Sequence, residues 1–193
     1  MIITYQGLEA FRISHGDLSL SVNPRSKLTD DITLVSSKPF MTESKGFLIN
    51  GPGEYEVKDI VVRGFLSETT YEGAKLNTIY QISMEGINIC FLGALSNPTL
   101  SSEAFEALED IDILFVPVGG NPPAGGVLDA ASAYKLAVSL EPAIIIPMHY
   151  DEKSLKQFLK EGGEEGMKPV DKLVIKKKDL EGKEGEIVVL KEE

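Results

Sequence analysis

Three side chains that could carry nucleophilic or acid-base chemistry follow apolar segments of the sequence. Ser36 and Ser37 come directly after the expected strand of residues 31–35, and His149 comes directly after the apolar residues 143–148. A serine hydroxyl and an imidazole base form a metal-free nucleophilic pair when a fold brings them together. The serines lack the Gly-x-Ser-x-Gly context of a nucleophile elbow, however, and the sequence assigns no acid to orient the imidazole. A Ser–His pair is therefore an alternative and not the leading hypothesis.

The segments that would position His149 have the pattern of buried parallel strands. Residues 111–116 and 143–146 are short, β-branched apolar runs that end near proline or glycine, as strands covered on both faces do. With a helix between them they form a βαβ unit. The loops after the carboxyl ends of parallel strands line one rim, so we expect residues 117–126 and 147–150 to share a rim that carries His149.

A glycine-rich loop, residues 119–126, belongs to the same rim. Its backbone N–H groups could face an anion, but Pro122 and Pro123 each lack this donor. We therefore favour a rigid turn that covers the rim over a phosphate-binding loop.

Other reactive or charged residues have simpler interpretations. His15 is expected in a solvent-exposed turn, since nothing nearby in the sequence offers a second ligand or a base partner. Cys90, the single cysteine, lies in the apolar residues 87–92 and is expected to be buried and unreactive. Residues 176–178 are three lysines, which we expect on the solvated side of an edge strand.

Composition limits the classes of function. The chain has 193 residues, 42% of them hydrophobic, and no segment typical of a linker, so we expect one domain, residues 1–193. A formal charge of −11 disfavours nucleic acid as a partner, because that binding depends on clustered Lys and Arg. We find no signal peptide and no run long enough to span a bilayer, and we expect no membrane association and a cytoplasmic location.

The first half of the chain reads as strands and the second half as alternating strands and helices. Helices are expected to begin after Thr99 or Ser101, at Asp129 and at Asp151, and the last two end near Leu140 and Glu161. The expected strands cover residues 2–5, 10–13, 18–22, 31–35, 47–50, 54–57, 60–65, 77–84, 87–92, 111–116, 143–146, 173–178 and 186–190.

This order of elements, together with several short phrases, resembles the metallo-β-lactamase superfamily, in particular the compact bacterial branch that includes ascorbate-6-phosphate lactonase-like proteins. The matching phrases extend over nearly the whole chain: residues 3–13 with Gly7, Val22-Asn23-Pro24, residues 51–57, 77–80 and 91–93, residues 113–120, Leu128-Asp129-Ala130 and residues 146–150. The resemblance implies an α/β fold, a four-layer αββα sandwich with two sheets face to face, helices on both outer faces and a site at one edge.

The metal-binding motif of that family does not match. The family's Thr-His-x-His-x-Asp-His falls on residues 36–42, so that its three histidines fall on Ser37, Pro39 and Thr42 and its aspartate on Met41. The next histidine would fall near Thr69, the bridging aspartate falls on Ala94, and the family's Asp-Pro is Asn23-Pro24. Only His149 keeps its position. Because a catalytic zinc site uses three protein ligands plus water, one imidazole does not hold a metal.

These observations predict a metallo-β-lactamase-fold protein without the metal-binding set, which acts as a non-catalytic binding or assembly module. The ligand-binding rim would comprise Ser36, Ser37, Lys38, Thr42, Ala94 and His149, with no catalytic residue, metal ligand or cofactor. The partner would be a small molecule or a protein, with a homo-oligomer or a hetero-oligomer with an active relative as options. The alternative is a divergent hydrolase of a small phosphorylated or lactone substrate, with zinc or manganese bound through His149, Glu54, Asp129 or a partner chain.

Overall fold

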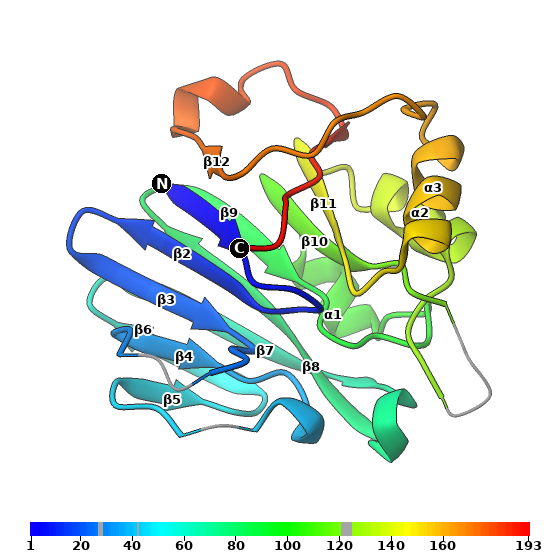
Figure 1. Cartoon of the computed structure of the whole chain (residues 1–193). Helices are drawn as coiled ribbons and strands as arrows, with labels where there is room; N and C mark the ends of the chain where they lie inside the picture. Colours follow the sequence, from blue (N-terminus) through cyan, green and yellow to red (C-terminus); the bar gives the residue numbers. More distant parts are fainter. Residues whose placement is uncertain (27–28, 42, 121–124) are drawn as a thin grey trace.

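Two β-sheets are packed face to face (Figure 1). The computed structural model describes residues 1–26, 29–41, 43–120 and 125–193. The first sheet has the strand order β12-β1-β2-β3-β4-β5. Its pairs are antiparallel from β12 to β3, whereas β3, β4 and β5 are parallel to one another. Its strands are β1 (Ile2–Tyr5), β2 (Phe11–His15), β3 (Leu18–Val22), β4 (Ile32–Leu34), β5 (Phe47–Ile49) and β12 (Leu173–Val174).

The second sheet has the strand order β13-β11-β10-β9-β8-β7-β6. Strands β6 to β9 form antiparallel pairs, and β9, β10, β11 and β13 are parallel, which confirms the predicted parallel pair before His149. Its strands are β6 (Gly53–Val57), β7 (Ile60–Glu68), β8 (Leu76–Met84), β9 (Ile87–Phe91), β10 (Ile113–Pro117), β11 (Ile144–Met148) and β13 (Glu186–Ile187).

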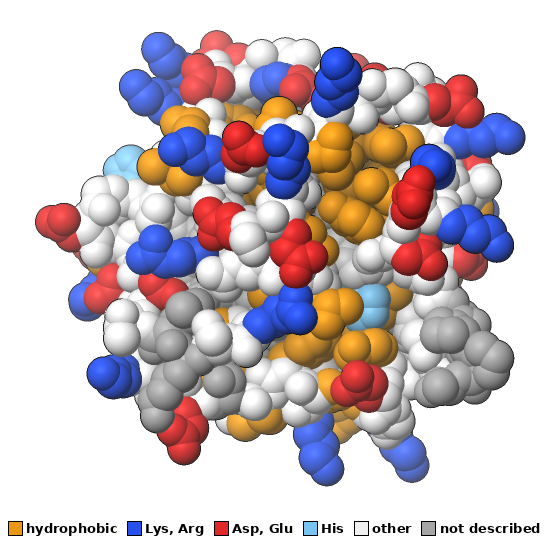
Figure 2. Space-filling view, in the orientation of Figure 1, with side chains coloured by type: hydrophobic (Ala, Val, Ile, Leu, Met, Phe, Trp, Pro, Cys, Tyr) orange, Lys and Arg blue, Asp and Glu red, His pale blue; other side chains and the backbone are white. Residues whose placement is uncertain are grey.

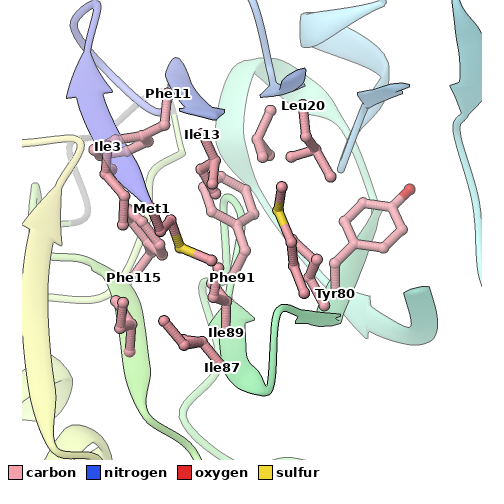
Figure 3. Packing of buried hydrophobic residues seen from close by; sticks show 14 of the residues in the cluster. Met1, Ile3, Phe11, Ile13, Leu20, Tyr80, Ile87, Ile89, Phe91 and Phe115 are labelled. Carbon is pink, nitrogen blue, oxygen red and sulfur yellow. The ribbon is translucent and has the colours of Figure 1, made fainter. Parts of the chain in front are cut away.

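The main hydrophobic core lies between the sheets (Figure 3). Phe11 of the first sheet packs against Phe91 and Phe115 of the second, with ring centroids 6.4 and 4.6 Å away. All three rings are at most 1% exposed. Because neighbouring strand residues point to opposite faces, alternate residues of each sheet supply this layer.

A second core lies between the seven-stranded sheet and the helices. The α-helices are α1 (Ser102–Ala107), α2 (Ala130–Ser139) and α3 (Glu152–Glu161), and the 3₁₀-helices are η1 (Lys38–Phe40), η2 (Tyr71–Gly73) and η3 (Lys177–Leu180). Side chains of Ser101, Asp129 and Asp151 accept hydrogen bonds at the three α-helix N-termini, as their sequence positions predict.

The predicted sandwich is confirmed, and one detail of its layers differs. The helices α2 and α3, and the residues Leu100 and Leu108 on either side of α1, pack in the core on the seven-stranded sheet. Within the described ranges, the outer face of the six-stranded sheet has no α-helix. Ser21 and Thr33 alternate with the core residues of β3 and β4 and are nevertheless buried, and Thr33 is hydrogen-bonded to Ser44 at 2.8 Å. Loop residues such as Ser44 therefore cover this part of the face in place of a helix.

The C-terminal segment departs from the predicted strands. The strand predicted for residues 173–178 is confined to β12, and that for 186–190 to β13. Lys177 and Lys178 lie in η3, so an edge-strand position for these two lysines is wrong. The ammonium group of Lys177 contacts both carboxylate oxygens of Asp112, at 2.8 and 2.7 Å. This long-range ion pair attaches the C-terminal segment to the sheet. No local sequence pattern predicts it.

The remaining surface features agree with the sequence. Figure 2 shows acidic and basic side chains interspersed on one face, with hydrophobic side chains between them. His15 is exposed as predicted, but it is the last residue of β2 and not part of the turn. Glu85 lies 3.6 Å from its ring, a neighbour that the sequence did not indicate. Cys90 is buried. Of the helices that the structure describes, none has the length and apolarity needed to cross a bilayer.

Candidate functional site

The candidate site lies where strands from both sheets end. Asn23 follows β3, Ser36 follows β4, Ala94 follows β9 and His149 follows β11. The strands β3 and β4 are parallel, and so are β9 and β11 with β10 between them, so that the carboxyl ends of each group open on one edge. Gly119 and His149 lie together as predicted, since a Cβ built on Gly119 would be 2.2 Å from the His149 carbonyl oxygen.

His149 is held by an acid that the sequence did not reveal. Its Nδ1 lies 2.6 Å from Oε1 of Glu9, whose side chain is completely buried. The His149 backbone N–H also donates to the carbonyl oxygen of Leu8 at 2.6 Å. Burial raises the pKa of Glu9 above its ordinary value, and hydrogen bonds from His149 and Asn23 act in the opposite direction. The imidazole is therefore oriented by a buried carboxyl group.

Asn23 links this pair to Ser36. Ser36 N–H donates to Asn23 Oδ1 at 2.8 Å, and because a backbone N–H only donates, this contact fixes the orientation of the amide. Asn23 Nδ2 then donates to Glu9 Oε2 at 2.9 Å and to Ser36 Oγ at 2.8 Å. Asn23 and Ser36 are both buried. The result is a buried chain of hydrogen bonds from Ser36 to His149.

The backbone of this network adopts an uncommon conformation at three positions. Leu8, Asn23 and His149 have φ angles of 54°, 43° and 52°, in the left-handed region. Such angles carry a local cost for residues other than glycine, least for asparagine, and persist where surrounding contacts over-determine them. The contacts of Glu9, Asn23 and His149 hold the backbone in this conformation.

A second polar residue, Asn77, fixes the loop that carries Ala94. Asn77 Nδ2 donates to Ser67 Oγ at 2.8 Å and to the Leu92 carbonyl oxygen at 2.9 Å. Its Oδ1 accepts the Ala94 N–H at 3.0 Å. Gly93, at φ +61°, approaches so closely that an added Cβ would be 2.4 Å from Asn77 Oδ1. Ala94 is thus packed and not available as a polar contact.

The other residues of the predicted rim have separate environments. Ser37 Oγ donates to the Leu76 carbonyl oxygen at 2.9 Å, and Lys38 begins η1. Ser36, Ser37 and His149 are all at this edge, but each bonds to a different partner: Asn23, Leu76 and Glu9. These hydrogen bonds therefore do not join either serine to His149 as a nucleophilic pair. Thr42 and the loop prolines Pro122 and Pro123 lie outside the described residues.

Aromatic side chains surround the open side of the network. Tyr71 stacks on Phe40 with centroids 5.7 Å apart, and its ring is edge-on to His149 at 4.5 Å. Burial, followed by the negative charge of Glu72, raises the pKa of Tyr71 to about 12. A cavity of about 300 Å³ lies beside these rings. We call its apolar lining the aromatic rim: Leu8, Pro24, Pro39, Phe40, Met41 and Tyr71, with Asn23, Arg25 and Glu72 as polar neighbours.

The donor atoms at this edge do not fit a family-type metal centre. Among residues 1–26, 29–41, 43–120 and 125–193, no three His, Cys, Asp or Glu side chains are grouped so as to hold a metal ion. Pro39 has no side-chain donor atom, and His149, whose Nδ1 is paired with Glu9, offers Nε2 alone. The alternative ligands are also engaged: Glu54 lies 3.5 Å from Arg63, and both Asp129 oxygens accept hydrogen bonds from Ser132.

Sequence reasoning missed Glu9, Asn23, Tyr71 and Asn77 as parts of the site. The sequence gives one indication of a role for Glu9, since this acid lies between the apolar residues Leu8 and Ala10, next to Phe11. A buried acid is rare unless it is paired, so this position predicts a partner for its carboxylate. Asn23 and Asn77 lie in phrases shared with the family, Val22-Asn23-Pro24 and residues 77–80, but these phrases do not indicate which partners their amides bind. Tyr71 gives no local signal, since its importance depends on contacts between distant segments.

Solved structures with the same architecture include several metallo-hydrolases. A protein from Thermotoga maritima, assigned to the Zn-dependent hydrolases of the metallo-beta-lactamase superfamily, is 25% identical, with a TM-score of 0.78 over 98% of this chain and 97% of that chain. The metallo-hydrolase Igni18 from Ignicoccus hospitalis is 15% identical, with a TM-score of 0.65 over 91% and 99% of the two chains. YhfI of Bacillus subtilis, a metallo-beta-lactamase fold protein, is 11% identical, with a TM-score of 0.65 over 98% and 95%.

A family model agrees with the fold. The model described as the beta-lactamase superfamily domain matches residues 2–149, which is most of the 193-residue chain and ends at His149. The match therefore includes the strands β1 to β11 of the two sheets and the edge that carries Glu9, Asn23, Ser36 and His149. On this evidence the chain belongs to the metallo-β-lactamase superfamily.

Proposed function

We propose that this chain is a non-catalytic member of its superfamily, a binding or assembly module that has lost the metal-binding set. The observation that carries the proposal is the set of donor atoms at this edge: among the described residues, no three His, Cys, Asp or Glu side chains are grouped so as to hold a metal ion. The pairing of His149 Nδ1 with Glu9 Oε1 at 2.6 Å leaves Nε2 as the ring nitrogen that could bind a metal, and one imidazole does not hold an ion.

The chemistry of the remaining donors supports this proposal. A catalytic zinc ion takes three protein ligands and a water, and it is the ion that lowers the pKa of that water toward 7. At the positions that match the family's ligands this chain has Ser37, Pro39 and Ala94, and Ser37 Oγ already donates to a backbone carbonyl group. We derive no hydrolytic step from such a set.

The strongest competing hypothesis is a divergent metal-dependent hydrolase of a small phosphorylated or lactone substrate. The relatives from Thermotoga maritima and Ignicoccus hospitalis give it weight, since both are assigned as metal-dependent hydrolases. Against it, Asp129 caps α2 and Glu54 is an exposed residue beside Arg63. Among the described residues, neither carboxylate belongs with His149 to a group of three or more possible metal ligands.

Metal content tests the proposal directly. The full chain would be purified from cells grown with added zinc and manganese, and its metal would be quantified by mass spectrometry beside the His149→Ala variant. We expect substoichiometric metal that is the same in both proteins. A stoichiometric ion in the wild type that is lost in His149→Ala would overturn the proposal and favour the hydrolase.

A further inference from the structure

We propose that the aromatic rim is the contact surface of a symmetric homodimer, in which a second copy of this chain covers the rim. This inference rests on the proposed non-catalytic role and specifies its partner. The same edge holds the cavity of about 300 Å³. In Figure 1 this edge lies between the loop after β1 and the short 3₁₀-helices η1 and η2 at the lower right.

The shape of the rim favours a protein surface over a small ligand. Two of its side chains project outward, since Leu8 is 39% and Met41 is 51% exposed. A ligand pocket encloses most of its occupant, and about 300 Å³ is the lower end of the usual volume. Side chains that protrude next to a shallow hollow instead suit a partner with the same features, because Leu8 and Met41 of one copy can enter the hollow of the other.

The residue types support the same conclusion. Phe40, Met41, Tyr71 and Arg25 belong to the residue types that are enriched in the cores of protein interfaces. Phe40 and Tyr71 are stacked on each other, and Tyr71 also contacts His149, so their rings are held before any partner arrives. Rigid aromatic side chains lose little conformational entropy on binding, which makes them effective anchors.

The charges beside the rim are self-complementary. Arg25 and Glu72 line the same cavity, and Arg25 is 54% exposed although its Nη1 contacts Glu192. Within the part of the chain that the structure describes, Glu72 forms no ion pair and accepts a hydrogen bond only from Tyr71 Oη. In a two-fold symmetric interface each contact between different residues occurs twice, so Arg25 of each copy can face Glu72 of the other. This local balance permits association of a chain whose net charge is −11.

Analytical ultracentrifugation over a concentration series tests the inference. We expect a dimer for the wild type. Glu72→Arg and Arg25→Glu should each weaken it at least about tenfold, because each places like charges opposite one another. The double variant Arg25→Glu/Glu72→Arg should regain the dimer, and a mixture of the two single variants should form a heterodimer. Circular dichroism would confirm that every variant is folded.

Met41→Lys and Val138→Lys form a matched pair of variants. Met41 and Val138 are both 51% exposed, but Val138 lies on α2 and outside the rim. We expect Met41→Lys to dissociate the dimer and Val138→Lys to leave it unchanged. A monomeric wild type, a dimer sensitive only to Val138→Lys, or charge reversal without rescue would each overturn the inference.

The two proposals fail in different ways. A dimer that carries stoichiometric zinc would refute the non-catalytic role and leave the interface intact. A metal-free monomer would refute the interface alone.

Discussion

Glu9 and His149 are 140 residues apart in sequence, and yet Glu9 Oε1 lies 2.6 Å from His149 Nδ1. The contact connects the loop between β1 and β2 to the end of β11, and thus joins the two sheets at their shared edge. Glu9 is fully buried, so its charge has little solvent to screen it and depends on His149 and Asn23 for compensation.

Removal of the imidazole should destabilise the chain in a pH-dependent way. His149→Ala leaves Glu9 buried without its main partner, which costs about 3–5 kcal/mol for a buried pair. The pKa of Glu9 is raised in the folded chain from its ordinary 4.5, so its contribution to stability is fully present below that value and is lost as the pH rises through the folded pKa. Without the hydrogen bond from His149 the folded pKa rises further, and the loss of stability above pH 4.5 grows. Urea unfolding at several pH values measures how the free energy of unfolding changes with pH. An equal pH dependence in wild type and variant would contradict the prediction.

Asn23 should contribute through its side chain and its backbone separately. Asn23→Ala removes three hydrogen bonds and also places alanine at φ +43°, whereas Asn23→Gly removes the bonds and tolerates that angle. Loss of the amide leaves buried partners unsatisfied, which costs about 1–3 kcal/mol. We therefore expect both variants to be less stable than the wild type, alanine more so, in chemical denaturation. A glycine variant of wild-type stability would show that the amide network contributes nothing.

The sequence predicted the fold because its signals are local. Buried runs such as residues 111–116 and 143–146 carry their own strand pattern, and Asp129 and Asp151 mark helix starts by their position before apolar residues. The family phrases then supplied the order of the strands. The predicted strand over residues 173–178 was too long because the Lys177–Asp112 contact, which holds η3, joins residues that are far apart in the chain.

The site was predicted only at its family positions. Ser36 and His149 were correctly placed at one edge, since both follow parallel strands. Glu9 was missed because it lies in a loop between antiparallel strands, and only the folded chain brings it under His149. Asn77 and Tyr71 were missed for the same reason: their contacts, with Ala94 and with His149, cross between distant segments.

Gly119 should tolerate no side chain. A Cβ at this position would lie 2.2 Å from the His149 carbonyl oxygen, and backbone cannot yield as a flexible side chain can. Gly119→Ala should therefore displace the His149 loop and cost about 1–3 kcal/mol, as overpacking commonly does. Gly51→Ala is the matched control, since nothing lies within 4 Å of its Cβ position and we expect a change of at most about 0.5 kcal/mol. Thermal unfolding of the two variants gives the comparison, and equal midpoints would refute the steric argument.

Cys90 reports on the opening of the second core. The thiol is completely buried on β9, and burial raises its pKa above the ordinary range, so that the reactive thiolate is scarce in the folded chain. Because it is the single cysteine, any labelling by a thiol reagent comes from this residue. We expect labelling in native buffer to be slow and independent of reagent concentration at high reagent, since the opening of the fold then limits the rate. Labelling in denaturant should be fast and proportional to reagent, which provides the control. Fast labelling of the native chain would mean that the helices do not cover this face of the sheet as tightly as their packing indicates.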